Sequence, residues 1–570
     1  MSYYLQPEWR RIRHAILERD EWKCRECSKI IKGRNAHVHH KLPRALGGQD
    51  IDENLISLCS ECHAIKHANL HVGLSTRFLQ VAAVKLAKLF GGDDLKRFDS
   101  DRLGIALRYM GVKRLRPNQL EPIVAALNGD NILLISPTGS GKSLCFQVPS
   151  LLAKSHSFAI SPLKALMADQ VVGLLRRNFP ATFLNSDLSN EEMSKRLSLL
   201  EKGIFKLVYL APERLAPSHR REKELKIIHQ NPPEYLIIDE AHCIDKWGTA
   251  FRPEYAKLGT YRQRLGNPQV LAFTATANPE TRIEILRALK AENAKVFVED
   301  LDRKNIAFAR LKMHDDVKRA KLIAELHTTM RRRTFGKTLV FVPTIALGEE
   351  VRDLLKKQDI SSKFFYGRLP SMEREIIIQG LRNDLNVETN DENSCVICTN
   401  AFGMGMDIPD IRLVFHWHHP SSLEDYAQEF GRAGRDGKQS LAVVFTKKDD
   451  EKLLNFIAEK SVGASEISEH SKAKALEKAK KSIQKMKVIA NQRDRCFNQL
   501  LLEELGSAQK PIPRLSRFFL NLAFAKWQRR ERRNFCCDGC WRKKHIGHAT
   551  NFTRDVVEKM EAHQQNLKNS

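Results

Sequence analysis

The sequence predicts an α/β protein with two tandem parallel-sheet domains, a small metal-stapled module before them and a helical metal-binding part after them. From about residue 105 to 450, short apolar runs alternate with helical segments, which is typical of parallel sheets covered on both faces. Paired CxxC motifs lie near the N-terminus, and a second cysteine cluster lies near the C-terminus. A chain of 570 residues is also too long for one ordinary domain.

Composition narrows the class of partner. Lys and Arg number 94 against 68 acidic residues, a formal net charge of +26. That excess favours nucleic acid as a partner, although a basic surface that only aids solubility has the same composition. No apolar stretch reaches the roughly 18 residues of a membrane span, and the N-terminus lacks a signal-peptide core. We therefore expect a cytoplasmic protein, nucleoid-associated in a prokaryote, whose 12 cysteines are reduced and favour metal sites.

The N-terminal module, residues 1–70, carries two cysteine knuckles, Cys24-Arg-Glu-Cys27 and Cys59-Ser-Glu-Cys62. Four thiolates are the ligand set of a tetrahedral structural Zn²⁺. We therefore predict one zinc ion bound by these four cysteines.

Histidines and an asparagine accompany the knuckles in an order that resembles the HNH endonuclease family. The matching positions are His39-His40, Gly47-Gly48, Asn54, His63 and His67. The resemblance implies a ββα-metal nuclease in which His39, His63 and His67 bind a divalent metal; the last two lie four apart, on one helix face. His40 would be the general base, because a neutral imidazole accepts a proton from water near pH 7. Asn54 would orient His40 through its carbonyl or, as in some members of the family, bind the metal.

Two points stay open in this module. His37 lies two residues before His39 and is expected to lie outside the site. A zinc module that only binds DNA would carry the same cysteines, so this alternative stands beside the nuclease.

A phosphate-binding loop follows the first apolar run of the α/β region. Ile135-Ser-Pro-Thr-Gly-Ser-Gly-Lys-Ser143 lies between an expected strand and helix, although Ser136 stands where the strict P-loop pattern has glycine. Its glycines let backbone N–H groups surround phosphate oxygens. The residues expected to bind ATP and Mg²⁺ are Thr138, Gly139, Ser140, Gly141, Lys142 and Ser143.

An acidic motif, Asp239-Glu-Ala-His242, directly follows the apolar run 235–238. Asp239 at a strand end can hold Mg²⁺, and Glu240 can polarise the water that attacks in phosphoryl transfer. An exposed acidic turn is the alternative, and the P-loop upstream argues against it.

These motifs, with others in the same order, resemble the RecQ family of superfamily 2 DNA helicases. The further matching segments are 109–119, 161–170, 211–215, 273–277, 399–408 and 428–437. The resemblance implies two RecA-like domains, with Gln119 reading the adenine edge and Arg116 ordering the site. Arg435 would be the arginine finger across the cleft, with Arg432 beside it, because arginine keeps its charge and donates two hydrogen bonds to a phosphate.

Segment 242–255 resembles the aromatic-rich loop of this family. Trp247 and Phe251 would stack on bases and Arg252 would contact the backbone, with core packing as the alternative for Trp247. The segment departs from the family's usual Ser-Gln and His-Asp at Asp245-Lys246 and Thr249-Ala250. We therefore expect an altered coupling between DNA binding and hydrolysis.

The remaining cysteines fall into two groups. Cys395 and Cys398 lie three apart on an apolar run and are expected to be core thiols on opposite faces of a strand, with Cys145 and Cys243 also in the core. A second zinc site resembling the family's zinc-binding subdomain is expected at Cys496, Cys536, Cys537 and Cys540, with His545 as a substitute ligand. Only 30 residues follow Cys540, too few for a winged-helix domain, so strong autonomous unwinding is not expected.

The predicted organisation has five parts. They are an HNH module (1–70), a helical linker (71–104), a first RecA-like domain (105–297), a second (298–450) and a basic helical region with the second zinc site (451–570). The predicted function is an ATP-dependent 3′ to 5′ DNA helicase or translocase coupled to a metal-dependent endonuclease, in defence against foreign DNA or in repair. Its expected partner is single-stranded or tailed duplex DNA, and no membrane. The alternative is a DNA-stimulated ATPase or helicase whose HNH-like module only binds DNA.

Overall fold

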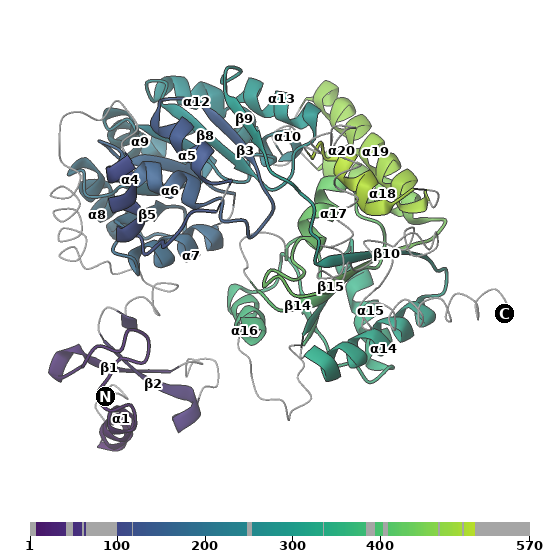
Figure 1. The fold of residues 1–570 in the computed structure, drawn as a ribbon, viewed down its shortest axis with the longest axis horizontal. Helices are drawn as coiled ribbons and strands as arrows, with labels where there is room; N and C mark the ends of the chain where they lie inside the picture. Colours follow the sequence, from purple (N-terminus) through teal and green to yellow (C-terminus); the bar gives the residue numbers. More distant parts are fainter. Residues whose placement is uncertain are drawn as a thin grey trace, which may run out of the picture.

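The structure is a computed structural model that describes residues 7–40, 49–59, 62–63, 100–116, 118–162, 164–247, 253–334, 336–382, 394–402, 408–464, 468–492 and 495–507. Figure 1 shows a small N-terminal module, two α/β domains and a group of C-terminal helices. This arrangement confirms the predicted fold class. Within the described ranges, none of the helices combines the length and the hydrophobicity that a membrane crossing requires.

The N-terminal module packs helix α1 (Pro7–Arg19) against an antiparallel hairpin of β1 (Ala36–His40) and β2 (Leu55–Cys59). Arg13 Nη2 donates to Ala36 O at 2.6 Å and Arg19 Nη2 donates to Leu55 O at 2.8 Å, which fixes the helix to both strands. Among the described residues, its core consists of Trp9, Ile16, Leu17, Cys24, Ile31, Ala36, Val38, Leu55, Leu58 and Cys59. Because a core of this size is small, we expect a bound metal to supply a large share of the stability of the module.

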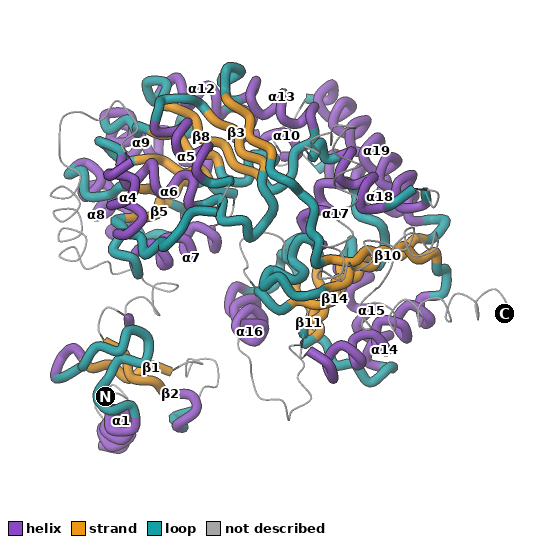
Figure 2. Tube along the Cα trace, viewed as in Figure 1, coloured by secondary structure: helices purple, strands orange, loops and turns teal. Residues whose placement is uncertain are grey.

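The first α/β domain is built on a parallel sheet. Its described strands are β3 (Ile132–Ile135), β4 (Ser157–Ile160), β5 (Ala181–Leu184), β6 (Leu207–Leu210), β7 (Tyr235–Ile238), β8 (Gln269–Thr274) and β9 (Lys295–Val298). Their order is β5-β6-β4-β7-β8-β3-β9, and each pairing is parallel. Every residue of β3 and of β7 is buried, because helices cover both faces, as Figure 2 shows.

The helices around this sheet connect the strands in turn. They are α4 (Ser100–Tyr109), α5 (Leu120–Leu127), α6 (Leu144–Leu152), α7 (Lys164–Leu175), α8 (Asn190–Glu201), α9 (Glu222–Gln230), α10 (Cys243–Trp247), α11 (Pro253–Ala256), α12 (Leu258–Arg264) and α13 (Pro279–Ala288). Because parallel strands all end on one edge, the loops after β3, β7 and β8 gather there.

The second α/β domain repeats the design. Its described strands are β10 (Ile306–Lys312), β11 (Lys337–Phe341), β12 (Lys363–Phe365), β13 (Cys395–Cys398), β14 (Ile411–His416) and β15 (Ser440–Thr446), in the parallel order β10-β15-β14-β11-β13-β12. Its helices are α14 (Asp316–Thr334), α15 (Ile345–Lys356), α16 (Ser371–Arg382) and α17 (Leu423–Phe430).

The C-terminal helices are α18 (Asp450–Gly463), α19 (Glu469–Asn491) and α20 (Phe497–Glu504). Helix α19 lies in the predicted basic helical region, and its C-terminal half carries a buried stripe of Ile483, Met486, Ile489 and Ala490. This stripe packs against α17, β15 and α20. Arg282 of α13 donates to the carbonyl oxygens of Leu505 (3.1 Å) and Gly506 (2.7 Å), so the C-terminal helices are fixed to the first domain as well.

The predicted core thiols are confirmed. Cys395 and Cys398 are fully buried and belong to different core clusters on the two faces of the second sheet, as strand alternation requires. Cys145 and Cys243 are fully buried in the first domain. Residues 71–99 of the predicted helical linker lie outside the described residues.

Candidate active sites

The phosphate-binding loop joins the end of β3 to the start of α6. Lys142 Nζ donates to Ser136 O at 2.7 Å, so the loop itself holds the ammonium group. Gly139 and Gly141 have φ of +81° and +89°, a region that side chains rarely adopt. At Gly141 a Cβ atom would also lie 2.6 Å from Gln119 Nε2, so a larger residue would have to displace the Gln119 amide. The other predicted nucleotide ligands lie in the same loop or cap α6: Thr138, Ser140 and Ser143.

Two side chains from the segment before α5 bind this loop. Arg116 Nη1 donates to Gly139 O at 2.8 Å, and Gln119 Nε2 donates to Gly141 O at 3.0 Å. The amide oxygen of Gln119 accepts from Arg116 N at 2.8 Å. The structure therefore places Arg116 and Gln119 at the P-loop, and their roles in reading the nucleotide remain predictions.

The acidic pair directly follows β7. Glu240 has φ of +51°, a left-handed conformation that a non-glycine residue seldom adopts without a constraint, and its N–H donates to Asp239 Oδ1 at 3.0 Å. Burial and the neighbouring Glu240 charge raise the pKa of Asp239. Burial also opposes ionisation of Glu240, but the hydrogen bond and charge of His242, with the charge of Lys142, hold its pKa below the ordinary value. Glu240 is thus kept as a carboxylate, able to accept a proton.

Two arginines from the second domain face this site. A Cβ atom on Gly139 would lie 3.9 Å from Arg435 Cγ, so the P-loop and Arg435 are in contact distance across the domain interface. Burial and the neighbouring Arg435 charge lower the pKa of Arg432 to about 10. Beside the two arginines, the amide of Gln428 donates to His242 Nε2 at 2.9 Å across the interface between the two domains. The structure brings these predicted residues together.

The residues at this interface fit Mg²⁺-bound ATP. Arg432 Nε is buried and has no hydrogen-bond partner among the described residues. Such a donor costs about 1–3 kcal/mol, which an anionic ligand would offset. A lysine, two arginines and two carboxylates are also the donor set that phosphoryl transfer needs.

The predicted DNA-contacting residues lie at the edge of the described chain. Trp247 is the last residue of α10, whereas Phe251 and Arg252 fall outside the described residues. Their contacts with DNA remain predictions.

Asp245, which stands where the RecQ family usually has serine, links three helices. Its Oδ2 accepts from Thr281 Oγ1 of α13 at 2.9 Å, and its Oδ1 accepts from Lys478 Nζ of α19. Asp245 is 11% exposed and Lys478 55%. The sequence showed the departure but not the partner, because the two residues lie 233 positions apart.

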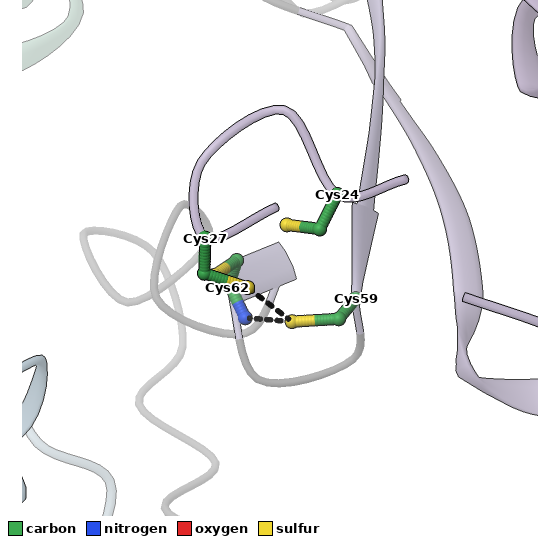
Figure 3. Close-up of side chains that lie close together, drawn as sticks. All are labelled: Cys24, Cys27, Cys59 and Cys62. Atoms are coloured by element: carbon green, nitrogen blue, oxygen red, sulfur yellow. Dashed lines mark hydrogen bonds between the residues drawn. The ribbon is translucent and has the colours of Figure 1, made fainter. Parts of the chain in front are cut away.

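The four cysteines of the N-terminal module converge, as Figure 3 shows. Their sulfur atoms lie within 4.8 Å of one another, and Cys27 Sγ is 3.8 Å from Cys59 Sγ. That separation is too long for a disulfide, but it equals the roughly 3.8 Å edge of a tetrahedron with Zn–S bonds of about 2.3 Å. Burial opposes ionisation of Cys24, yet N–H donors of Cys59 and Cys27 bring its pKa down to about 7, whereas burial and the neighbouring thiols raise the pKa of Cys59 and of Cys62. The cluster therefore fits a structural Zn²⁺, with Cys62 as its fourth ligand.

His40, the predicted general base, lies on the buried face of β1 and is 7% exposed. Its Nε2 lies 2.6 Å from Asp50 Oδ1, and its ring stacks on Trp9 with centroids 5.1 Å apart. Asn54, predicted to orient His40, donates its amide to Gln49 O at 2.8 Å. The carboxylate of Asp50 therefore fixes the imidazole. Sequence reasoning missed Asp50, and its only signal was an acidic residue shortly after the glycine pair.

The other histidines gather on the opposite face of β1. His63 lies against the ring edge of His39, at 5.5 Å between centroids, which brings two predicted metal ligands together. His63 also stacks on His37 at 4.5 Å. His37, which was expected to lie outside the site, therefore lies beside His63, because two residues along a strand return to the same face. Among the described residues, only the cysteines gather three or more donors within 4.8 Å. His67 is not among those residues.

The second predicted zinc site is described only in part. Cys496 caps α20 and is half-buried against the core. Cys536, Cys537 and Cys540, like His545, lie outside the described residues, so this site remains a prediction.

Three families match successive parts of the chain: HNH endonuclease at residues 24–69, DEAD/DEAH box helicase at 116–285 and helicase conserved C-terminal domain at 317–437. A crystal structure of the DUF1998 helicase MrfA bound to DNA and AMPPNP shares the fold, with a TM-score of 0.50 at 21% identity. The alignment covers 68% of this chain and 58% of that one.

Relatives of the whole motor region are closer in sequence. The probable ATP-dependent DNA helicase RecS of Bacillus subtilis is 37% identical over 366 residues, 64% of this chain and 70% of the relative. ATP-dependent DNA helicase RecQ of Pasteurella multocida is 33% identical over 62% of this chain and 54% of its own length. For RecQ-like DNA helicase BLM of Xenopus laevis the identity is 34%, over 60% of this chain and only 25% of the relative. The chain therefore belongs to the RecQ-like family of DNA helicases and carries an HNH endonuclease domain on the N-terminal side of its motor.

Proposed function

We propose that the chain is an ATP-driven DNA helicase or translocase that moves 3′ to 5′ and is coupled to a metal-dependent DNA endonuclease. One observation carries the motor half: the P-loop of the first domain meets Arg435 of the second, at 3.9 Å from a Cβ on Gly139. Family membership supports ATP as the fuel and DNA as the track.

In this motor, Lys142, Ser143 and Asp239 would hold Mg²⁺-bound ATP. The nucleotide supplies the phosphoanhydride bond whose cleavage releases free energy. Glu240 accepts the proton of the attacking water, since its low pKa keeps it ionised. Arg432 and Arg435 donate to the transferred phosphoryl group and stabilise its charge.

Movement follows from the division of these residues between two domains. The arginines reach the P-loop only when the domains are closed, so hydrolysis and domain opening are linked. The link Asp245–Lys478 joins the helix that ends at Trp247 to the C-terminal helices. We propose that Trp247, Phe251 and Arg252 contact the DNA strand and that this connection transmits the contact.

The nuclease half rests on the HNH module. His40 would take a proton from water, and Asp50 holds its ring in place. His39 and His63 would hold a divalent metal, with His67 as a third ligand, and that ion stabilises charge on the leaving oxygen when bound. The tetrathiolate zinc site staples the fold around them, and a second zinc is proposed at the C-terminal cysteines. A motor that exposes DNA for cutting suits defence against foreign DNA or repair.

A second candidate function rests on the burial of His40. Because its side chain is stacked on Trp9 and only 7% of the residue is exposed, the module also suits DNA binding without cleavage. Binding of duplex DNA by the full chain, with no metal-dependent nicking in Mg²⁺ or Mn²⁺, would favour this function.

The motor half is tested by displacement of a labelled strand from 3′-tailed and 5′-tailed duplexes, with ATP turnover followed in parallel. We expect DNA-stimulated hydrolysis and displacement of the 3′-tailed substrate, both abolished in Lys142→Ala. Turnover without displacement would leave a DNA-stimulated ATPase, and wild-type turnover by Lys142→Ala would overturn the P-loop assignment.

A further inference from the structure

The segment that joins the two α/β domains, residues 299–305, contacts both catalytic loops. It begins directly after β9 and ends at the start of β10. Its first residue reaches the P-loop, and its last residues reach the loop that carries the arginines.

At the first end, Glu299 holds the start of the P-loop. Ser136 Oγ donates to Glu299 Oε2 at 2.7 Å, and Glu299 N donates to Ile135 O at 2.8 Å. Ser136 is fully buried, and its carbonyl oxygen accepts from Lys142 Nζ. Ser136 also donates its N–H to the carbonyl oxygen of Thr274, the last residue of β8, at 3.0 Å. Ser136, which stands where the P-loop pattern has glycine, therefore lets the linker bind the P-loop through a side-chain hydrogen bond.

The same carboxylate contacts the segment before α5. Asn118 donates a hydrogen bond to Glu299, and Asn118 directly precedes Gln119, which binds Gly141 O. Glu299 thus touches both parts of the proposed nucleotide site without belonging to any recognised motif.

At the other end, Arg303 and Asn305 hold the backbone of the arginine loop. Arg303 donates to the carbonyl oxygens of Gly431 (3.0 Å), Ala433 (2.7 Å) and Gly434 (3.1 Å), and Asn305 donates to Gly434 O at 2.8 Å. These carbonyls lie on either side of Arg432 and next to Arg435. Gly434 has φ of +54°, and a Cβ there would lie 2.4 Å from Asn305 Nδ2, so loop and linker fit each other closely.

The middle of the linker is held by the C-terminal helices. Asn498 Nδ2 of α20 donates to Asp302 Oδ1 at 2.9 Å, and Leu301 N donates to Ser507 Oγ at 3.2 Å. The linker is therefore braced by hydrogen bonds in its middle as well as at both ends.

We propose that Glu299 is a positioning residue for ATP hydrolysis, which fixes the P-loop through Ser136 and links its position, through the braced linker, to Arg432 and Arg435. This inference rests on the proposed ATPase. Glu299 acts through other residues and takes no part in the chemistry itself.

The geometry separates two effects of Glu299, its acceptor oxygen and its charge. In Glu299→Ala the acceptor is lost, and we expect kcat to fall about ten-fold, the effect of one charge-assisted hydrogen bond. In Glu299→Gln the amide oxygen still accepts from Ser136, so kcat should stay within about two-fold. The same variant removes a negative charge beside the triphosphate site, so its KM for ATP should fall.

The experiment measures DNA-stimulated ATP hydrolysis by the full chain for Glu299→Ala, Glu299→Gln, Ser136→Ala and the double variant Ser136→Ala/Glu299→Ala. Glu280→Ala, an exposed carboxylate of the same domain, is the matched control. Ser136→Ala should also lower kcat, and the double variant should lose less than the product of the two single losses, because both changes remove the Ser136–Glu299 hydrogen bond. Thermal unfolding checks that each variant is folded.

Wild-type kcat in a folded Glu299→Ala, or losses that multiply in the double variant, would overturn the inference while leaving the ATPase intact. A kcat of Glu299→Gln as low as that of Glu299→Ala would also overturn it. Failure of the proposed function looks different: the wild-type chain would then neither hydrolyse ATP nor bind a fluorescent ATP analogue, and both proposals would fall.

Discussion

Replacing Cys59 by serine removes one ligand of the tetrathiolate cluster and tests what holds the N-terminal module together. Cys59 ends β2, is 1% exposed, and its sulfur lies 3.8 Å from that of Cys27. In the described part of the module the core has ten buried hydrophobic residues, and two of them, Cys24 and Cys59, are predicted ligands. A core of this size supplies at most about 3–5 kcal/mol, whereas a structural zinc contributes roughly 10–16 kcal/mol of apparent binding free energy. Without zinc, residues 7–63 should therefore unfold.

The assay combines zinc content by atomic emission with calorimetric unfolding of the full chain. Cys59→Ser should lose one zinc per chain and the transition of the N-terminal module, while the transition of the α/β domains stays where it is. Cys145→Ala is the matched control, since that thiol is buried in the first domain away from the cluster. Wild-type zinc content and an unchanged unfolding profile in Cys59→Ser would refute the reasoning.

Three further predictions concern the motor. Asp245→Ala should lower DNA stimulation of the ATPase about five-fold, because a partly exposed ion pair and one hydrogen bond are together worth about 1 kcal/mol. The charge swap Asp245→Lys with Lys478→Asp should restore the stimulation. A swap that stimulates no better than either single change would contradict the link between the two residues. Arg435→Lys should lower kcat about 10³-fold with little change in KM for ATP, since lysine cannot donate two parallel hydrogen bonds to a phosphate. A rise in KM as large as the expected fall in kcat would instead assign Arg435 to binding of ATP in the ground state. Burial raises the pKa of Asp450 to about 6, above its ordinary 3.8, so the ionised form costs stability as pH rises through 6. Asp450→Asn should therefore raise the free energy of unfolding by on the order of 2 kcal/mol at pH 8, with the gain gone below pH 4; a gain that does not depend on pH would exclude this cause.

The strands of both sheets could be predicted where burial is complete on both faces. Runs such as β3, β6, β7 and β13 are wholly apolar and wholly buried. The edge strand β9 is half exposed, and its Lys-Val-Phe-Val sequence carries no comparable signal. The order of the strands could not be predicted from the sequence either, since it depends on contacts between distant segments.

The candidate sites divide in the same way. Lys142 and Glu240 lie in local motifs whose spacing reflects the phosphate or metal they hold, so a single segment reveals them. Glu299 could not be found in this way, because its partner Ser136 lies 163 positions away and no local pattern joins them. The sequence did not reveal that His37 lies beside His63, although the two-residue period of a strand places His37 on the same face as His39.

The central claim is that the motor and the nuclease work as one enzyme, and cleavage of a 3′-tailed duplex by the full chain tests it most directly. Cutting is measured in Mg²⁺ or Mn²⁺, with and without ATP, for wild type, His40→Ala and Lys142→Ala. We predict that ATP stimulates cutting by the wild type, that His40→Ala hydrolyses ATP but does not cut, and that Lys142→Ala loses the ATP-dependent part of the cutting. Unchanged cleavage by His40→Ala, or wild-type cleavage that does not respond to ATP, would contradict the claim.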